Sequence, residues 1–98
     1  MRESAVERYL VKQVKAAGGF TAKWTSPASS GLPDRVVVIA GSTVFVEVKA
    51  PGKEPRPLQL ARHREIERAG GKVLVIDSKE GVDAMVRALS CQSSPTGT

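Results

Sequence analysis

The sequence has little of what would suit it to an oxidising compartment or a membrane. It contains one cysteine, Cys91, so no disulfide can form within the chain. No apolar run approaches the ~20 residues that a helix needs to cross a bilayer. The first residues are charged and lack the apolar core of a signal peptide. We therefore expect a cytoplasmic protein without a disulfide framework.

The chain has a surplus of positive charge. Its 15 Lys and Arg outnumber its 10 Asp and Glu, which gives a net charge of +5. Such a surplus suits an acidic partner such as nucleic acid, although it equally suits an ordinary basic protein. Three acidic residues, Asp34, Glu47 and Asp77, lie in apolar or strand-like sequence, where phosphate binding alone gives no reason for a carboxylate. A bound metal ion would supply that reason.

Hydrophobic spacing and turn residues predict one α/β domain over residues 1–89 and a flexible tail over 90–98. Ser4 and Glu7 have the spacing of a capping box at the start of the first helix. The uninterrupted apolar run 73–76 predicts a buried strand that is parallel to its neighbour. The fold class is thus a mixed β-sheet flanked by helices. The predicted helices cover 4–17, 58–69 and 79–89, and the predicted strands cover 20–24, 35–39, 44–48 and 73–76.

Three ionisable residues converge on one end of the predicted hairpin. Asp34 lies where a loop enters the first hairpin strand, and Glu47 and Lys49 lie near the end of the second. Because side chains alternate along a strand, Glu47 and Lys49 point to the same face. A turn centred on Gly41 places Asp34 opposite residue 48 or 49, and therefore next to Glu47.

This grouping suits metal-assisted phosphodiester hydrolysis. Mg²⁺ prefers oxygen ligands and is typically held by one or two carboxylates together with substrate phosphate. Asp34 and Glu47 would supply the carboxylates, and the main-chain carbonyl of Val48 is a third candidate ligand. Lys49 is placed to orient a water molecule or to stabilise charge on the phosphate. The alternative, purely structural interpretation is a surface aspartate at a turn beside a salt bridge within a strand.

The motif Gly31-Leu-Pro-Asp34, followed thirteen positions after the aspartate by Glu47-Val-Lys49, resembles that of the PD-(D/E)XK nuclease superfamily. Together with the compact size and Gln59 after a proline-rich loop, it looks similar to the stand-alone VRR-Nuc domains of phages and bacteria. This resemblance implies a restriction-endonuclease-like fold similar to the Holliday junction resolvases. It further implies dependence on Mg²⁺ or Mn²⁺, action on branched DNA, a homodimer, and the cytoplasm of a bacterium or phage-infected host.

The resemblance also implies two further catalytic residues. The acid that the family carries on its first helix maps onto Glu7, with Glu3 as the alternative. The family's glutamine at the start of the second helix maps onto Gln59. Both have structural explanations too, because Glu7 suits a capping box and Gln59 suits a solvated first helical turn.

Basic and polar side chains near the motif are candidates for contacts with DNA phosphates, although each is individually as consistent with a solvated surface residue. On the helix 58–69, Leu60 and Ile66 are expected to face the core. His63 lies among arginines, so we interpret it as a surface residue or a DNA-backbone contact. The candidate DNA contacts are Lys23, Ser29, Arg35, Lys53, Arg56 and Arg62.

These observations predict a metal-dependent DNA endonuclease. One alternative is a non-catalytic DNA-binding module on the same fold, because a fold does not fix chemistry. Another is a small structural or interaction domain, which would show no salt-dependent DNA binding. The intact set of Asp34, Glu47 and Lys49 favours the enzyme, since a module without catalysis has no need for two carboxylates beside phosphate.

Overall fold

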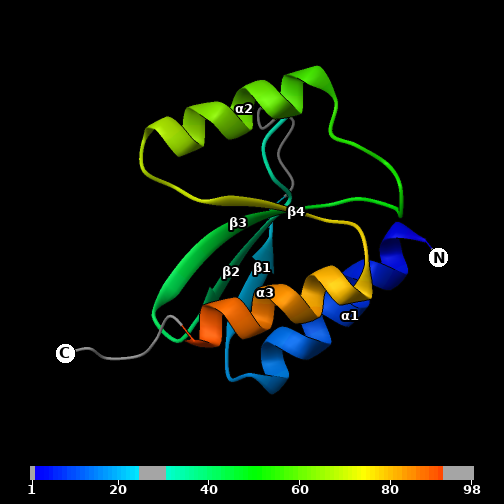
Figure 1. Cartoon of the computed structure of the whole chain (residues 1–98), viewed down its shortest axis with the longest axis vertical. Helices are drawn as coiled ribbons and strands as arrows, with labels where there is room; N and C mark the ends of the chain where they lie inside the picture. Colours follow the sequence, from blue (N-terminus) through cyan, green and yellow to red (C-terminus); the bar gives the residue numbers. More distant parts are fainter. Residues whose placement is uncertain (1, 25–30, 92–98) are drawn as a thin grey trace.

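Helices cover both faces of a four-stranded sheet in the computed structural model, which describes residues 2–24 and 31–91. Helix α2 lies on one face, and α1 and α3 lie together on the other (Figure 1). The predicted α/β class with its mixed sheet is confirmed. The helices are α1 (Glu3–Ala16), α2 (Pro57–Arg68) and α3 (Lys79–Cys91), and the strands are β1 (Phe20–Lys23), β2 (Arg35–Ile39), β3 (Ser42–Val48) and β4 (Val73–Ile76).

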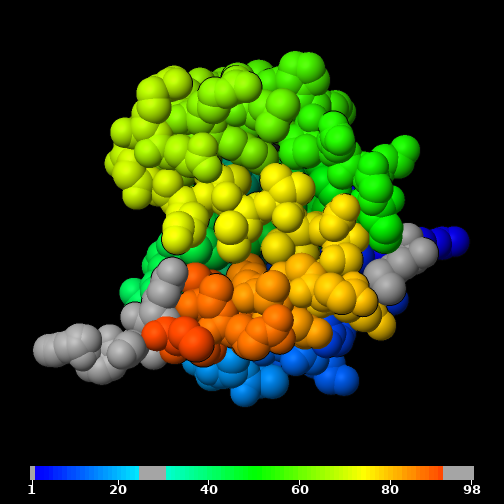
Figure 2. Space-filling model, in the orientation of Figure 1, coloured from blue at the N-terminus to red at the C-terminus, as the bar shows by residue number. Residues whose placement is uncertain are grey.

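The strands lie in the order β1-β2-β3-β4. The first three are antiparallel, whereas β4 runs parallel to β3 after the chain crosses over through α2. The predicted parallel pairing is confirmed, but the prediction that this strand is buried is wrong for most of it. Because β4 ends the sheet, Val75 is 43% exposed. The β4 segment, in yellow, reaches the surface between α2 and α3 (Figure 2).

The β2–β3 hairpin is tighter than predicted. Its turn consists of Ala40 and Gly41 alone, with φ of 52° and 86°, and a two-residue hairpin turn with positive φ at both positions suits the twist of the strands. Arg35 therefore pairs with Val46, one or two positions earlier in β3 than predicted. Continued by one residue, this register sets position 34 opposite Glu47.

The apolar core lies between the sheet and helices α1 and α3. Along β3, Val44, Val46 and Val48 are buried in this core, whereas Phe45 and Glu47 alternate to the face that carries α2. No helix in the described ranges is both long and apolar enough to cross a bilayer. The core comprises Val6, Leu10, Val14, Val37, Ile39, Val44, Val46, Val48, Ile76, Val82, Met85 and Leu89.

The start of α1 differs from the prediction. The residue that caps it is Arg2, which makes no side-chain capping hydrogen bond, so the capping box of Ser4 and Glu7 is wrong. Glu7 instead accepts a hydrogen bond from Arg35 on β2, because a buried guanidinium needs a charged partner. At the other end of the chain, α3 extends to Cys91, two residues into the predicted tail.

The hairpin turn gives a stability prediction. Ala40 adopts a left-handed conformation that costs an L-residue with a Cβ atom roughly 1 kcal/mol, whereas asparagine tolerates it. Ala40→Asn should therefore increase the free energy of unfolding by roughly 0.5–1 kcal/mol. Urea denaturation followed by circular dichroism would measure this. A decrease in stability would contradict the two-residue turn and the register it sets.

Candidate active site

Glu47 is the centre of a polar cluster between β3 and α2. It is only 3% exposed. Its Oε2 atom accepts a hydrogen bond from Gln59 Nε2 at 3.0 Å and lies 3.7 Å from Nζ of Lys49. Burying a carboxylate costs stability unless neighbours compensate for the lost hydration. The position of Glu47 therefore needs an explanation beyond packing.

Asp34 is the residue immediately before β2, and it lies near Glu47. Its Oδ2 atom accepts a hydrogen bond from the backbone N–H of Val48 at 3.3 Å. The preceding residue is held as well, because Trp24 Nε1 donates to the carbonyl of Pro33 at 2.8 Å. These contacts fix the aspartate at the same end of the sheet as Glu47.

The glycine of the motif, Gly31, is required by a close approach between two segments. Gly31 has φ of +81°, and a Cβ atom there would lie 2.8 Å from Cγ of Leu58 on α2. Only glycine has both the conformational freedom and the small size for this position. The segment that carries Asp34 can therefore pack directly against α2.

Asp34 and Glu47, the acidic pair, disfavour each other's ionisation. Burial of Glu47, together with the negative charge of Asp34, raises the pKa of Glu47 from 4.5 to about 7, and the nearby Lys49 opposes this rise. A divalent cation relieves such repulsion, because it favours both ionised carboxylates at once. The electrostatics of the acidic pair therefore favour a cation site.

The acidic pair and Lys49 line an open cleft of about 610 Å³. Three of the predicted DNA contacts, Lys23, Lys53 and Arg56, line the same cleft. Acidic side chains suit a cation, and the basic side chains around them suit a polyanion that brings its phosphate to that cation. The cleft therefore contains groups for both.

The other predicted DNA contacts lie elsewhere. Arg35 is 8% exposed, and its Nη1 donates to Glu7 Oε2 at 2.6 Å, so it is committed to an internal ion pair. Arg62 lies 3.2 Å from Glu65 on the surface of α2 and is not part of the cleft. Ser29 lies outside the described residues.

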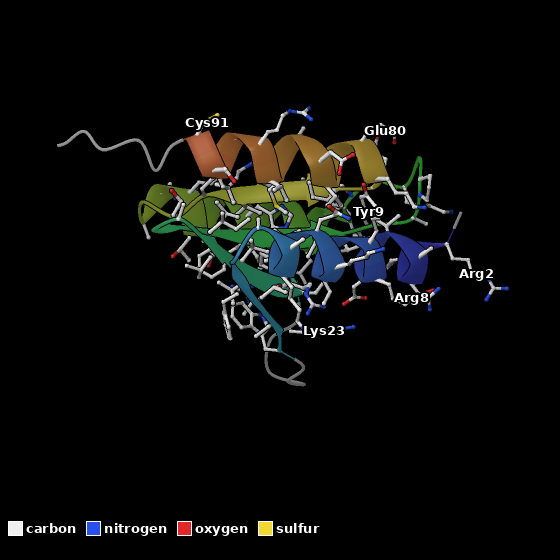
Figure 3. All side chains as sticks on the ribbon, turned by 90° about the horizontal axis from the view of Figure 1, so that it is seen from below. Arg2, Arg8, Tyr9, Lys23, Glu80 and Cys91 are labelled. Atoms are coloured by element: carbon white, nitrogen blue, oxygen red, sulfur yellow. The ribbon has the colours of Figure 1, made fainter. Side chains whose placement is uncertain are left out.

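Glu7, the preferred candidate for the helix acid, does not line the cleft. It lines a second groove of about 540 Å³ along α1, where its Oε2 atom contacts Arg35 and lies 3.5 Å from Lys23. Arg8 on α1 and Lys23 on β1 point to the same side of the molecule (Figure 3). Glu3, the alternative, does line the cleft, and its charge contributes to the raised pKa of Glu47.

His63 is buried at the site, so its interpretation as a surface residue is wrong. It is 6% exposed, and its Nε2 atom lies 3.7 Å from Oε1 of Glu47. The interpretation failed because it assumed that α2 turns Leu60 inward, whereas Leu60 is 40% exposed. The missed signal was spacing. His63 follows Gln59 by four residues, so the two lie on one helix face.

The described residues contain no group of three or more His, Cys, Asp or Glu side chains arranged to hold a metal ion. The acidic pair offers two carboxylates, and Oε1 of Glu47 is buried without a hydrogen-bond partner. Two carboxylates with room for water and substrate oxygens suit Mg²⁺ or Mn²⁺, whereas structural zinc sites use four protein ligands. The donor set therefore fits a hard divalent cation.

Comparison with known proteins identifies the family, although no family model matches the chain. The chain is 42% identical over 81 residues to "Putative nuclease p44" of Acyrthosiphon pisum secondary endosymbiont phage 1, across 82% of this chain and 87% of that protein. A solved structure described as "VRR_NUC domain" matches the chain with a TM-score of 0.77 and 32% identity, over 87% of this chain and 94% of that one. The chain belongs to the VRR-Nuc nuclease family.

The raised pKa of Glu47 predicts how this VRR-Nuc chain responds to pH without metal. The carboxyl group ionises near pH 4.5 in the unfolded chain but near 7 in the folded one. Ionisation therefore destabilises the fold, with no effect below the lower value and the full effect above the higher one. Glu47→Gln should raise the melting temperature in EDTA at about pH 8 and change it little at about pH 4.5.

Thermal denaturation followed by circular dichroism would measure this difference. Glu65→Gln is the matched control, because Glu65 is an exposed glutamate on α2 and the same substitution should give no such contrast between the two pH values. A Glu47→Gln variant that is no more stable than wild type at the higher pH would show that the carboxylate is not destabilising.

Proposed function

We propose that this VRR-Nuc chain is a Mg²⁺- or Mn²⁺-dependent endonuclease that hydrolyses phosphodiester bonds of DNA, with branched DNA as its preferred substrate. The observation that carries the proposal is the convergence of Asp34, Glu47 and Lys49 on one cleft whose other lining residues include Lys23, Lys53 and Arg56. An acidic centre among basic side chains suits a metal-assisted reaction on a phosphate backbone.

The acidic pair would hold the metal through carboxylate oxygens, with the Val48 carbonyl as a third ligand. The unpartnered Oε1 atom of Glu47 and the mutual repulsion of the two acids both support this assignment. When bound, the cation supplies Lewis acidity at the phosphate and lowers the pKa of a coordinated water. Val48 also fixes Asp34 through its backbone N–H, which donates to Oδ2.

The remaining residues have separate roles. Lys49 holds its ammonium group beside Glu47 at 3.7 Å, where it would orient the attacking water or stabilise charge on the phosphate. Gln59 would fix the Glu47 carboxylate, since its amide donates to one carboxylate oxygen while its own oxygen accepts from the Arg56 N–H. As the acid from α1, Glu3 is favoured over Glu7, because Glu3 lines the cleft and Glu7 is paired with Arg35.

The alternative function is that of a non-catalytic DNA-binding module. One experiment distinguishes it from a nuclease. Both would bind DNA, but only the nuclease would cut it when metal is added. The destabilising acidic pair favours the nuclease, because selection for binding alone would replace a carboxylate that repels phosphate and weakens the fold.

Cleavage of a labelled panel of four-way junction, flap, splayed and linear DNA, with and without Mg²⁺ or Mn²⁺, tests the proposal. Wild type should nick the branched substrates with metal and leave all of them intact in EDTA. Asp34→Asn and Glu47→Gln should each reduce the rate at least about 100-fold while DNA affinity changes little, because each removes a charged metal ligand.

Glu65→Gln serves as the control for general effects of losing a carboxylate, and it should cut at the wild-type rate. Binding of the whole panel without any metal-dependent cleavage would support the non-catalytic module instead. Cleavage by both isosteric variants at the wild-type rate would refute the assignment of the site.

The basic side chains of the cleft give a prediction about affinity. Lys53→Ala and Arg56→Ala should each weaken DNA binding and each reduce the slope of log K against log salt by about 1, as expected when one phosphate contact is lost. Arg62→Ala should change the slope less, because Arg62 is paired with Glu65 outside the cleft. Fluorescence anisotropy across a salt series would measure these slopes. Equal effects of all three variants would contradict the proposal that DNA binds along the cleft.

We also propose that the protein acts as a homodimer in the cytoplasm of a bacterial or phage-infected cell. The dimer is supported by exposed apolar side chains, including Phe20 at 59% and Val75 at 43%. The cellular setting is supported by the phage origin of the relative. Light scattering that gives the mass of a single chain, with and without DNA, would argue against the dimer.

A further inference from the structure

Helix α2 is attached to the sheet in an unusual way for a helix of a globular protein. Its two buried residues are Gln59 and His63, which are both polar. They lie four residues apart and therefore on one face of the helix. The side chains of both approach Glu47 on β3. The buried face of α2 is thus built around one carboxylate.

The two oxygens of Glu47 have different surroundings. Oε2 accepts the hydrogen bond from Gln59 and has Lys49 nearby. Oε1 faces Nε2 of His63 at 3.7 Å, and both of these atoms are buried without a hydrogen-bond partner. Buried polar atoms in proteins nearly always have a partner. Two buried atoms that lack partners and face each other therefore need a functional explanation.

We propose that His63 is a positioning residue that holds the Glu47 carboxylate in the orientation needed to bind the catalytic cation. This inference rests on the proposed metal site. An N–H···O hydrogen bond spans about 2.9 Å, so a shift of less than about 1 Å brings Nε2–H of His63 onto Oε1. With Gln59 on one oxygen and His63 on the other, the carboxylate can no longer rotate, and it presents its free lone pairs to the cation.

The chemistry of the imidazole supports this role. Either ring nitrogen of an imidazole can carry its hydrogen, so the nitrogen that faces Glu47 can be a donor to Oε1. A neutral donor fixes a carboxylate without cancelling the negative charge that attracts the cation.

A purely structural role would be served better by an apolar side chain. A leucine of similar size would fill the space without leaving an unpaired nitrogen in the interior. The histidine is thus expected to lower the stability of the metal-free protein and to raise its affinity for metal. This combination distinguishes positioning from packing.

Three variants of the full chain test the proposal by metal binding rather than by cleavage. His63→Leu fills the space and removes the donor, whereas His63→Gln retains an N–H donor near the position of Nε2. Arg64→Gln is the control, because Arg64 is the next residue on α2 and is exposed. Mn²⁺ affinity would be measured by electron paramagnetic resonance without DNA, and melting temperatures would be measured in EDTA.

We expect His63→Leu to weaken Mn²⁺ binding by about 10- to 100-fold, which is typical of removing a partner that orients a metal ligand. Its melting temperature should equal or exceed that of wild type. His63→Gln should recover most of the affinity, and Arg64→Gln should match wild type.

If the His63→Leu variant bound Mn²⁺ as tightly as wild type, the proposed role of His63 would be overturned while the metal site itself would stand. A His63→Gln variant that binds no better than His63→Leu would overturn it as well, because a donor at that position would then not matter. Failure of the proposed function looks different. In that case, wild type itself would bind Mn²⁺ no better than Asp34→Asn, and both proposals would fall together.

Discussion

The burial of the Glu47 carboxylate determines how α2 and the loop before β2 are arranged around the sheet. Glu47 is placed beneath α2, where hydration is lost and Asp34 adds a second negative charge, so its pKa rises to about 7. Gln59 and Lys49 compensate in part, and the Gly31 segment packs closely enough on α2 to bring Asp34 to the site. The arrangement is unfavourable for an empty protein and favourable for one that binds a cation.

The hairpin explains why the acidic pair forms at all. The two-residue turn at Ala40 and Gly41 sets the register of β2 against β3, and that register brings position 34 beside position 47. A slip of one residue would move every side chain of one strand to the opposite face. The geometry of the site thus depends on a turn at the far end of the same two strands.

Much of this could be predicted from the sequence, because strand periodicity is simple. Alternation in β3 predicted that Glu47 and Lys49 share a face, and a hairpin turn around Gly41 placed Asp34 next to Glu47, although the register differs from the predicted one by one or two residues. The orientation of α2 could not be predicted in the same way, because its pattern allowed either Leu60 or Gln59 and His63 to face the sheet. Likewise, Glu7 suited a local capping box, and only the tertiary fold revealed Arg35 as its partner.

The polar attachment of α2 divides the molecule into two parts with different origins of stability. Helices α1 and α3 share an apolar core with the sheet, and the ion pair between Glu7 and Arg35 adds to the contact of α1. Of the two buried side chains of α2, Gln59 donates a hydrogen bond to the titratable Glu47 and His63 lies 3.7 Å from it, so the docking of α2 is coupled to whatever binds there. The rate of amide hydrogen exchange in α2 should therefore change when the cleft is occupied, whereas the rates in α1 and α3 on the opposite face of the sheet should not.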